Sequence, residues 1–259
     1  MFYRALSTVL GFLFPKPEVK GVGINVHSVK LPVDKLKAID IAWVRIDLPE
    51  NEWTDGKAKE LREHYKDFGQ LWIASHTWPN LERKARYLKS LGLSDLELFN
   101  EPKLLGITTK QYFEAFKSLK KVFKGRIYAP SLSTWTNEKF YLEELIKMGM
   151  RGFIKAVHFY WEGTPEETAE VWKRECPDAV CTEICWLESH NYRNRLGISS
   201  NAEAFLRAKK AFEGMTWCWY RAPDEGGEHD TGLFSRDDLW KFIYPNETYE
   251  EILASGGST

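Results

Sequence analysis

Residues 95–131 read DLELFNEPKLLGITTKQYFEAFKSLKKVFKGRIYAPS and contain the unit that the rest of the chain repeats. An apolar run at 95–100 is followed by a helical region and then by a second apolar run at 126–131. Thr108 and Gln111 have the spacing of a capping box, which predicts that the helix begins there. Apolar residues then recur at helical spacing, at Tyr112, Phe116, Leu119 and Phe123. The segment therefore predicts a strand, a helix and a second strand.

Short apolar runs alternate with amphipathic stretches along the whole chain. The runs that are typical of strands are 21–26, 41–47, 70–76, 95–100, 126–131, 154–160, 179–185 and 214–219. Helices are predicted between them from apolar spacing in 58–68, 81–91, 112–123 and 204–212, from start signals at Thr164 and Ser200, and for an eighth helix at 236–243 or 247–254. Several runs are almost continuously hydrophobic, which is typical of parallel strands covered on both faces. Strict alternation of strand and helix predicts a parallel sheet.

The number of units and the chain length together predict how this sheet is arranged. Eight units in a chain of 259 residues match the size of a closed barrel with little decoration. A doubly wound open sheet is the alternative, but it would normally carry a glycine-rich phosphate turn after its first strand. Gly21 and Gly23 lie at the start of that strand instead. We therefore expect a single-domain α/β fold, a closed (β/α)8 TIM barrel, over residues 21–254.

The chain ends and the composition limit the partners of this barrel. The apolar segment 1–20 is too short to span a bilayer, and we expect it to pack on the barrel bottom, with a flexible tail at 255–259. The net charge is -1 and no basic face is visible, which argues against nucleic-acid binding. We expect a soluble monomer without a membrane span. No small-residue cleavage site precedes Pro15, and the compartment, cytoplasmic or secreted, stays open.

The four cysteines, Cys176, Cys181, Cys185 and Cys218, predict free thiols. They form no CxxC pair and have no histidine at ligand spacing, so we expect neither a metal site nor a cofactor. Cys181 and Cys185 stand two residues either side of Glu183. Strand alternation would place these three side chains on one face.

Polar and tryptophan side chains gather where the predicted strands end. In a barrel of this kind the carboxyl ends of the strands face one opening, where function collects. The polar residues at these ends include Asn25, His27, Arg45, Asp47, His76, Asn100, Glu101, His158, Tyr160 and Glu183. The tryptophans there are Trp78, Trp135, Trp161, Trp186 and Trp219. Flat apolar faces around a polar cleft suit pyranose rings, which have apolar C–H faces and hydroxyl edges. The substrate class predicted is therefore carbohydrate.

Two glutamates carry a resemblance to a known group of enzymes. Asn100-Glu101-Pro102 ends the fourth run, and Thr182-Glu183 lies on the seventh. This pattern resembles clan A of the glycoside hydrolases, (β/α)8 barrels whose acid/base glutamate follows an asparagine at the end of strand 4 and whose nucleophilic glutamate ends strand 7. The resemblance implies a retaining glycosidase that cleaves β-glycosidic bonds of an oligo- or polysaccharide, with Glu101 as acid/base and Glu183 as nucleophile.

The same resemblance implies roles for further residues. Arg45 is similar to the strand-2 arginine near the nucleophile, His76 to the strand-3 histidine, and His158 and Tyr160 to the strand-6 pair. One of Trp217 and Trp219 would be the strand-8 tryptophan beneath the sugar. Trp135, Trp186 and Asn100 are the other expected substrate contacts, with Asn100 bonded to the sugar 2-hydroxyl. Cys185 departs from the clan, in which many members carry glycine.

The chemistry implies different ionisation states for the two glutamates. We expect Glu183 to be ionised, favoured by Arg45 and by a hydrogen bond from Tyr160, and Glu101 to be protonated at rest with a raised pKa. Two alternatives stay open. A barrel that binds glycans without cleaving them would usually lack one of the two carboxylates. A metal-dependent barrel hydrolase would carry paired histidines on its first strand, where His27 stands alone.

Overall fold

The computed structural model describes residues 19–133, 135–160, 164–185 and 201–220. Eight strands form a closed parallel barrel, in which each strand pairs with its neighbours in chain order and the last pairs with the first. They are β1 (Val22–Asn25), β2 (Trp43–Ile46), β3 (Gly69–Ile73), β4 (Asp95–Glu97), β5 (Arg126–Leu132), β6 (Ile154–Tyr160), β7 (Val180–Cys185) and β8 (Trp217–Trp219). The predicted closed (β/α)8 barrel is confirmed, and every strand overlaps the run predicted for it.

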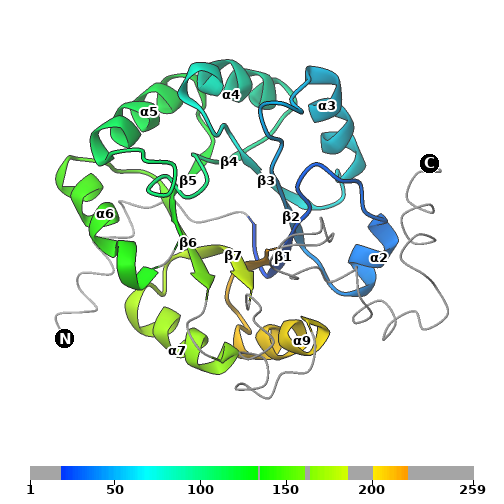
Figure 1. Cartoon of the computed structure of the whole chain (residues 1–259). Coiled ribbons are helices and arrows are strands. Elements are labelled where there is room, and N and C mark those ends of the chain that lie inside the picture. The colour runs from blue at the N-terminus through cyan, green and yellow to red at the C-terminus, as the bar shows by residue number, and fades with distance from the viewer. Residues whose placement is uncertain (1–18, 134, 161–163, 186–200, 221–259) are drawn as a thin grey trace.

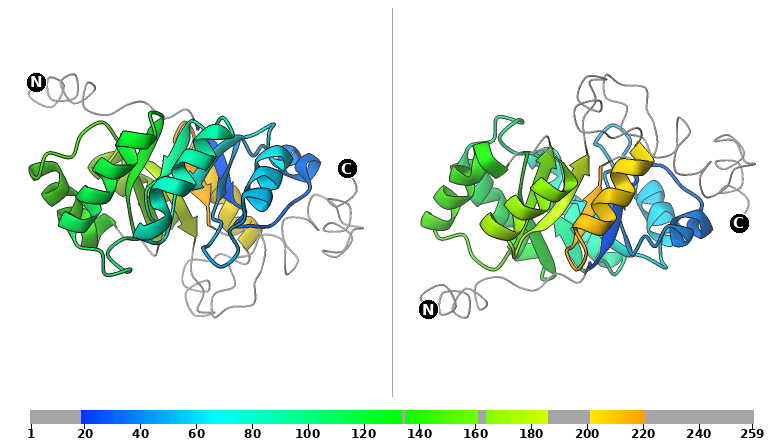
Figure 2. Two further views of the ribbon diagram at one scale, coloured as in Figure 1. Left: turned by 90° about the horizontal axis from the view of Figure 1, so that it is seen from above. Right: turned by 90° about the horizontal axis from the view of Figure 1, so that it is seen from below.

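Helices surround this barrel as an outer layer (Figure 1). They are α2 (Val33–Ala38), α3 (Asp55–His64), α4 (Leu81–Ser90), α5 (Thr109–Val122), α6 (Trp135–Lys147), α7 (Pro165–Glu175) and α9 (Asn201–Ala211), and the short 3-10 helix η1 (Trp78–Asn80) precedes α4. The views from above and from below, each turned by 90° from that of Figure 1, show the strands enclosed by this layer (Figure 2). The helix predicted at 236–243 or 247–254 lies outside the described residues. Within them, no helix is long and apolar enough to cross a membrane.

Helix starts follow the capping signals of the sequence. Thr108 and Gln111 form a complete capping box at α5, and Thr164 and Glu167 form another at α7. Each box satisfies backbone N–H groups that have no partner inside the helix. The predicted starts of α5 and α7 are thereby confirmed, whereas the start signal at Ser200 lies outside the part of the chain that the structure describes.

The core has two layers because each strand buries both of its faces. Outward side chains pack under the helices in one large cluster that includes Trp72, Trp172 and Trp217. Inward side chains fill the barrel itself, and this interior cluster consists of Val19, Trp43, Leu71, Tyr128, Ile154, Ala156, Val180 and Cys218. Val19 belongs to the segment expected to cover the barrel bottom, of which residues 1–18 lie outside the described ranges. The interior cluster forms an apolar floor below the polar strand ends.

A β-bulge in β7 changes the face on which its side chains lie. Val157 pairs with Cys181 whereas the next residue, His158, pairs with Glu183, so that Thr182 is an extra residue in β7. Cys181 consequently packs in the outer cluster, while Glu183 contacts residues of the barrel interior. The expectation that these two side chains share a face was therefore wrong. Cys176, Cys181 and Cys218 are buried free thiols, and the side chain of Cys185 lies outside the description.

Gly23 provides a test of the tight interior packing. A Cβ atom added at Gly23 would overlap the indole ring of Trp43, which is fully buried inside the barrel. We expect Gly23→Ala to lower the free energy of unfolding by about 1–3 kcal/mol, because a packed core must shift to admit the methyl group. Urea denaturation measures this loss. Gly56→Ala is the control. Gly56 lies in the first turn of α3, and the atom nearest to an added Cβ there is Thr54 Oγ1 at 3.9 Å. This substitution should leave the free energy of unfolding unchanged or slightly higher.

Candidate active site

Arg45 lies at the centre of the polar strand ends. Its Nε and Nη2 donate to the two carboxylate oxygens of Glu97 at 2.7 and 2.6 Å, and Nη1 donates to Glu183 Oε1. Nη2 also donates to Asn100 Oδ1 at 2.8 Å. Burial alone would lower the pKa of Arg45, but the charges of Glu97 and Glu183 raise it well above its usual value. The guanidinium thus stays ionised and joins β2 to β4 and β7.

Glu97 is a site residue that the sequence analysis did not identify. It is fully buried on β4, and both of its carboxylate oxygens accept hydrogen bonds from Arg45. A signal was available: Asp95 and Glu97 alternate with Leu96 and Leu98, which places both acids on the inward face. A buried arginine requires such a partner, because an isolated charge in the interior is costly.

His158 lies between the two predicted catalytic glutamates. Its Nδ1 is 3.0 Å from Glu101 Oε1 and 3.5 Å from Glu183 Oε2. One ligand atom from each of these three residues lies within 4.8 Å of the other two. His158 and Glu183 are buried, and Glu101 retains 21% of its side-chain exposure. The structure therefore brings Glu101, Glu183, Arg45, Asn100 and His158 together, as the sequence predicted.

The ionisation of Glu101 differs from the expectation. Burial acts to raise its pKa, but the hydrogen bond and positive charge of His158, together with Arg45, lower it below the usual value. Burial likewise acts to lower the pKa of His158, whereas the charges of Glu183 and Glu101 and the hydrogen bond to Glu101 raise it. The direction of this shift is opposite to the raised pKa expected for Glu101, because His158 lies against its carboxylate.

The loop that carries Glu101 has an unusual backbone. Phe99 and Glu101 adopt φ angles of 57° and 45°, a region that side chains other than glycine rarely occupy. Such conformations cost about 1–3 kcal/mol each and persist only where the surroundings enforce them. The ring of Phe99 packs edge-on against Tyr112 at 5.9 Å, and the Tyr112 hydroxyl donates to the Leu98 carbonyl oxygen. These contacts hold the turn that directs Glu101 toward His158.

A second polar group lies beside the first, at the ends of β1, β2 and β3. His76 Nε2 is 2.5 Å from Asp47 Oδ1, and His27 Nδ1 is 4.0 Å from Asp47 Oδ2. The fully buried Asn25 accepts from the backbone N–H of His27, while its own amide nitrogen has no partner among the described residues. His76, predicted as a substrate contact, thus lies at the mouth with a carboxylate partner.

The predicted tryptophans do not all reach this mouth. Trp217 and Trp219 are buried and pack against Phe205 of α9 at ring distances of 5.6 Å each, on the outer face of β8. Neither indole is therefore brought to the carboxylates, and the strand-8 sugar platform expected from one of them is not found there. Trp135 is also buried in the outer cluster, where its Nε1 donates to Glu175. Trp186 and the side chain of Tyr160 lie outside the described part of the chain.

The group Glu101, His158 and Glu183 has the composition of a possible metal site. Two carboxylates and an imidazole are ligands that several divalent ions accept. In the present geometry Arg45 already donates to Glu183 Oε1, and the Nδ1 of His158 lies against both carboxylates. An ion at this position would have to displace the hydrogen bond between His158 and Glu101.

No family model and no curated protein matches the chain. Several solved structures share its fold. A subgroup VI exo-β-1,3-glucanase of glycoside hydrolase family 128 from Aureobasidium namibiae has a TM-score of 0.54 and 14% identity, over 83% of this chain and 87% of that one. A family 39 β-xylosidase from Caulobacter crescentus has a TM-score of 0.54 and 14% identity, over 86% of this chain and 70% of that one. At these identities the likeness concerns the fold alone.

The energetic role of Glu97 can be measured directly. Glu97→Gln removes the charge that balances buried Arg45, so we expect it to lower the free energy of unfolding by about 3–5 kcal/mol. The readout is the urea midpoint of the full chain. Glu63→Gln is the control, because Glu63 is exposed and pairs with exposed Lys66 at 2.7 Å. Equal midpoints for the two variants would contradict a central role for Glu97.

Proposed function

We propose that the protein is a retaining glycoside hydrolase that cleaves β-glycosidic bonds of an oligo- or polysaccharide. The observation that carries this proposal is the spacing of Glu101 and Glu183, whose nearest ligand oxygens lie within 4.8 Å of each other. Retaining enzymes hold their two carboxyl groups about 5–5.5 Å apart, whereas inverting enzymes need about 6.5–9.5 Å to admit a water molecule. The spacing therefore favours the retaining reaction.

In this proposal Glu183 is the nucleophile that attacks the anomeric carbon. Its Oε1 accepts a hydrogen bond from Arg45, while its Oε2 lies 3.5 Å from Nδ1 of His158. Glu101 protonates the leaving oxygen and later takes a proton from water, which releases the sugar from Glu183. Asn100, fixed by its bond to Arg45, contacts the sugar 2-hydroxyl.

The proton that Glu101 delivers is shared with His158. The two side chains lie 3.0 Å apart, so one proton between them can reside on either group. When the leaving oxygen takes the proton from Glu101, the imidazole can supply it along the same hydrogen bond. A lowered pKa of Glu101 in the unliganded site is thus compatible with an acid role, provided that His158 holds the proton at rest.

The support for a β-linked glycan as substrate comes from solved structures of similar fold. The solved structures of similar fold include proteins named as an exo-β-1,3-glucanase and a β-xylosidase. Both names denote enzymes that act on β-linked sugars. Both predicted carboxylates are present, which favours catalysis over simple glycan binding. A metal-dependent hydrolase is the second candidate, because Glu101, His158 and Glu183 could hold an ion. Turnover that survives dialysis against a chelator would exclude that second candidate.

The roles of the two glutamates predict different defects. Glu183→Ala should abolish turnover of the natural glycan, and added azide should partly restore turnover of an activated aryl β-glycoside, because azide enters the vacated space. Glu101→Gln should slow substrates with poor leaving groups by about 10²–10⁴-fold and those with good leaving groups far less, since only the former need protonation. Both are measured by steady-state kinetics, on a panel of β-glucans, xylans, mannans and galactans and on aryl β-glycosides with good and poor leaving groups.

Two outcomes would overturn this assignment. Full activity in Glu183→Ala would remove the nucleophile, and equal losses on both leaving-group classes in Glu101→Gln would indicate a binding role instead. Near-native Tm values and circular dichroism spectra in both variants are required controls, because Glu183 also partners the buried Arg45.

The shared proton predicts a shift in the pH profile. In the unsubstituted protein the pair should keep its proton to a higher pH than a free imidazole does, because Glu183 and Glu101 raise the pKa of His158. In His158→Gln the proton must reside on Glu101 alone, so the basic limb of kcat/KM should move to lower pH. Substrates with poor leaving groups report this limb. An unchanged basic limb, with the fold intact, would show that His158 does not hold the proton.

A further inference from the structure

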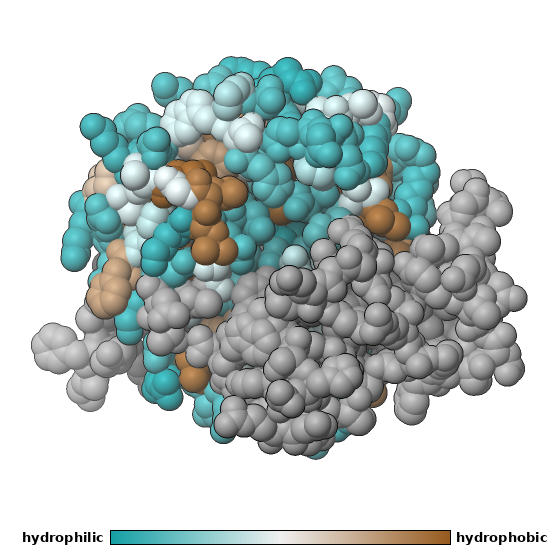
Figure 3. Space-filling model, viewed as in Figure 1, coloured by the Kyte–Doolittle hydropathy of each residue, from teal (hydrophilic) through white to brown (hydrophobic). Residues whose placement is uncertain are grey.

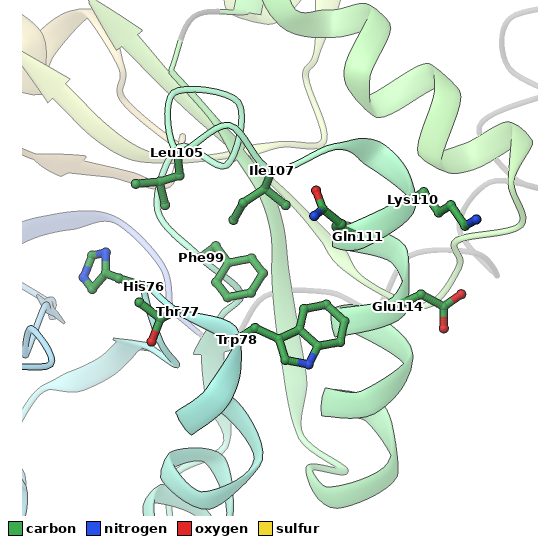
Figure 4. Close-up of a pocket in the computed structure, with 9 residues that line it drawn as sticks. All are labelled: His76, Thr77, Trp78, Phe99, Leu105, Ile107, Lys110, Gln111 and Glu114. Carbon is green, nitrogen blue, oxygen red and sulfur yellow. The ribbon is translucent and has the colours of Figure 1, made fainter.

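A cavity of about 690 Å³ lies between η1 and the segment that joins β4 to α5. Its volume is within the range of about 300–1,000 Å³ that small-molecule sites occupy. Figure 4 shows its lining side chains, with the ring of Phe99 at the centre, Leu105 and Ile107 on one side and the Trp78 indole on the other. None of these four residues belongs to the proposed catalytic group.

The walls of the cavity are apolar yet partly open to solvent. Trp78 is 45% exposed and Leu105 is 49% exposed, whereas Phe99 is only 1% exposed and forms the floor. On the face shown in Figure 3, hydrophobic residues gather over the loop between β4 and α5, and most of the surface around them is hydrophilic. A ligand that covers the exposed indole and the apolar floor removes apolar surface from water, which lowers the free energy of the complex.

Polar groups without partners stand around this apolar surface. The indole N–H of Trp78 and the ammonium of Lys110 make no hydrogen bond or ion pair within the described ranges. The side-chain oxygen of Gln111 accepts from Thr108 in the capping box, and its amide nitrogen makes no further bond to the described residues. These donors are exposed at the rim of the cavity, where they can bond to hydroxyl oxygens of a ligand that also has an apolar face.

Two of the residues that line the cavity, Phe99 and His76, connect it to the candidate active site. Phe99 precedes Glu101 by two positions in the strained turn at the end of β4. His76 lines the cavity and is bonded to Asp47, which follows Arg45 by two positions. A chain-like ligand with one unit at the carboxylates could therefore place another unit in the cavity.

We propose that this cavity is a binding subsite for a pyranose ring of the glycan, with Trp78 stacked on the apolar C–H face of the ring. This inference rests on the proposed function, because it assigns the occupant as a second unit of the same substrate. Indole rings supply a large apolar face and a polar N–H, a combination that suits a ring with hydroxyl edges. Lys110 and Gln111 donate to those hydroxyls from the rim.

Glu50 keeps the Trp78 loop in place before any sugar binds. Its Oε1 accepts from the Ser75 hydroxyl at 2.7 Å, the His76 backbone N–H at 3.0 Å and the Thr77 hydroxyl at 3.3 Å. Burial acts to raise the pKa of Glu50, but these bonds and Lys84 lower it to about 2. The loop is consequently ordered in advance, which reduces the entropy lost when a ligand binds.

The test is isothermal calorimetry of the full chain with short and long oligosaccharides derived from β-glucan, xylan, mannan and galactan. The Glu101→Gln background keeps these ligands intact. Trp78→Ala should lower the association constant of the long oligosaccharides by about tenfold, equivalent to about 1.4 kcal/mol, and the loss should shrink for the short ones. Trp78→Phe should recover part of it, because an aromatic face remains. Phe140→Ala is the matched control, since Phe140 is 67% exposed but does not line this cavity.

The outcomes separate this inference from the proposed function. If turnover behaves as proposed but Trp78→Ala binds every oligosaccharide as its background does, the subsite is wrong and the hydrolase stands. If oligosaccharide binding requires Trp78 but the wild-type chain turns none of the panel over, the subsite stands and the hydrolase is wrong. If no oligosaccharide binds, or if Phe140→Ala weakens binding as much as Trp78→Ala, the subsite is overturned.

Discussion

The burial of the Arg45 charge is the constraint on which the site depends. A guanidinium with no exposed surface needs its charge and its N–H donors satisfied inside the protein, and Glu97, Asn100 and Glu183 satisfy them. Glu97 and Glu183 come from β4 and β7, which are not adjacent strands. Closure of the barrel brings both to the same arginine. The geometry of the two carboxylates thus follows from the fold together with the need to satisfy one buried charge.

The apolar floor below Arg45 makes this requirement stringent. Trp43 lies two positions before Arg45 on β2, and it is fully buried with Tyr128 and Cys218 in the interior cluster. Water cannot solvate the guanidinium from that side, so the carboxylates must do so. Groups that are fixed in this way do not have to reorganise when charge develops on a ligand, which is the condition for effective electrostatic catalysis.

Periodicity predicted the eight strands, because strand length and helix spacing are local properties. It could not decide which face of a strand lies inward when both faces are apolar. In β8 the sequence Trp217-Cys218-Trp219 is hydrophobic throughout, and the structure turns Cys218 inward and both tryptophans toward α9. In β7 a single extra residue, Thr182, reverses the alternation. Polar strand ends were easier to predict, because a buried charge must find a partner across the barrel.

The protonation states of the site residues were harder to predict than the identity of those residues, because protonation depends on the distances between charged groups. Arg45 and a protonated His158 face three carboxylates, those of Glu97, Glu101 and Glu183, so the fully ionised group has one excess negative charge. Under the proposed reaction, positive charge develops on the sugar as the bond to the leaving group breaks. A site with a buried negative excess stabilises that charge more than it stabilises the neutral ground state. Arg45 donates to Glu97 through two nitrogens and to Glu183 through one, so most of its hydrogen bonds to carboxylates go to Glu97 and not to Glu183.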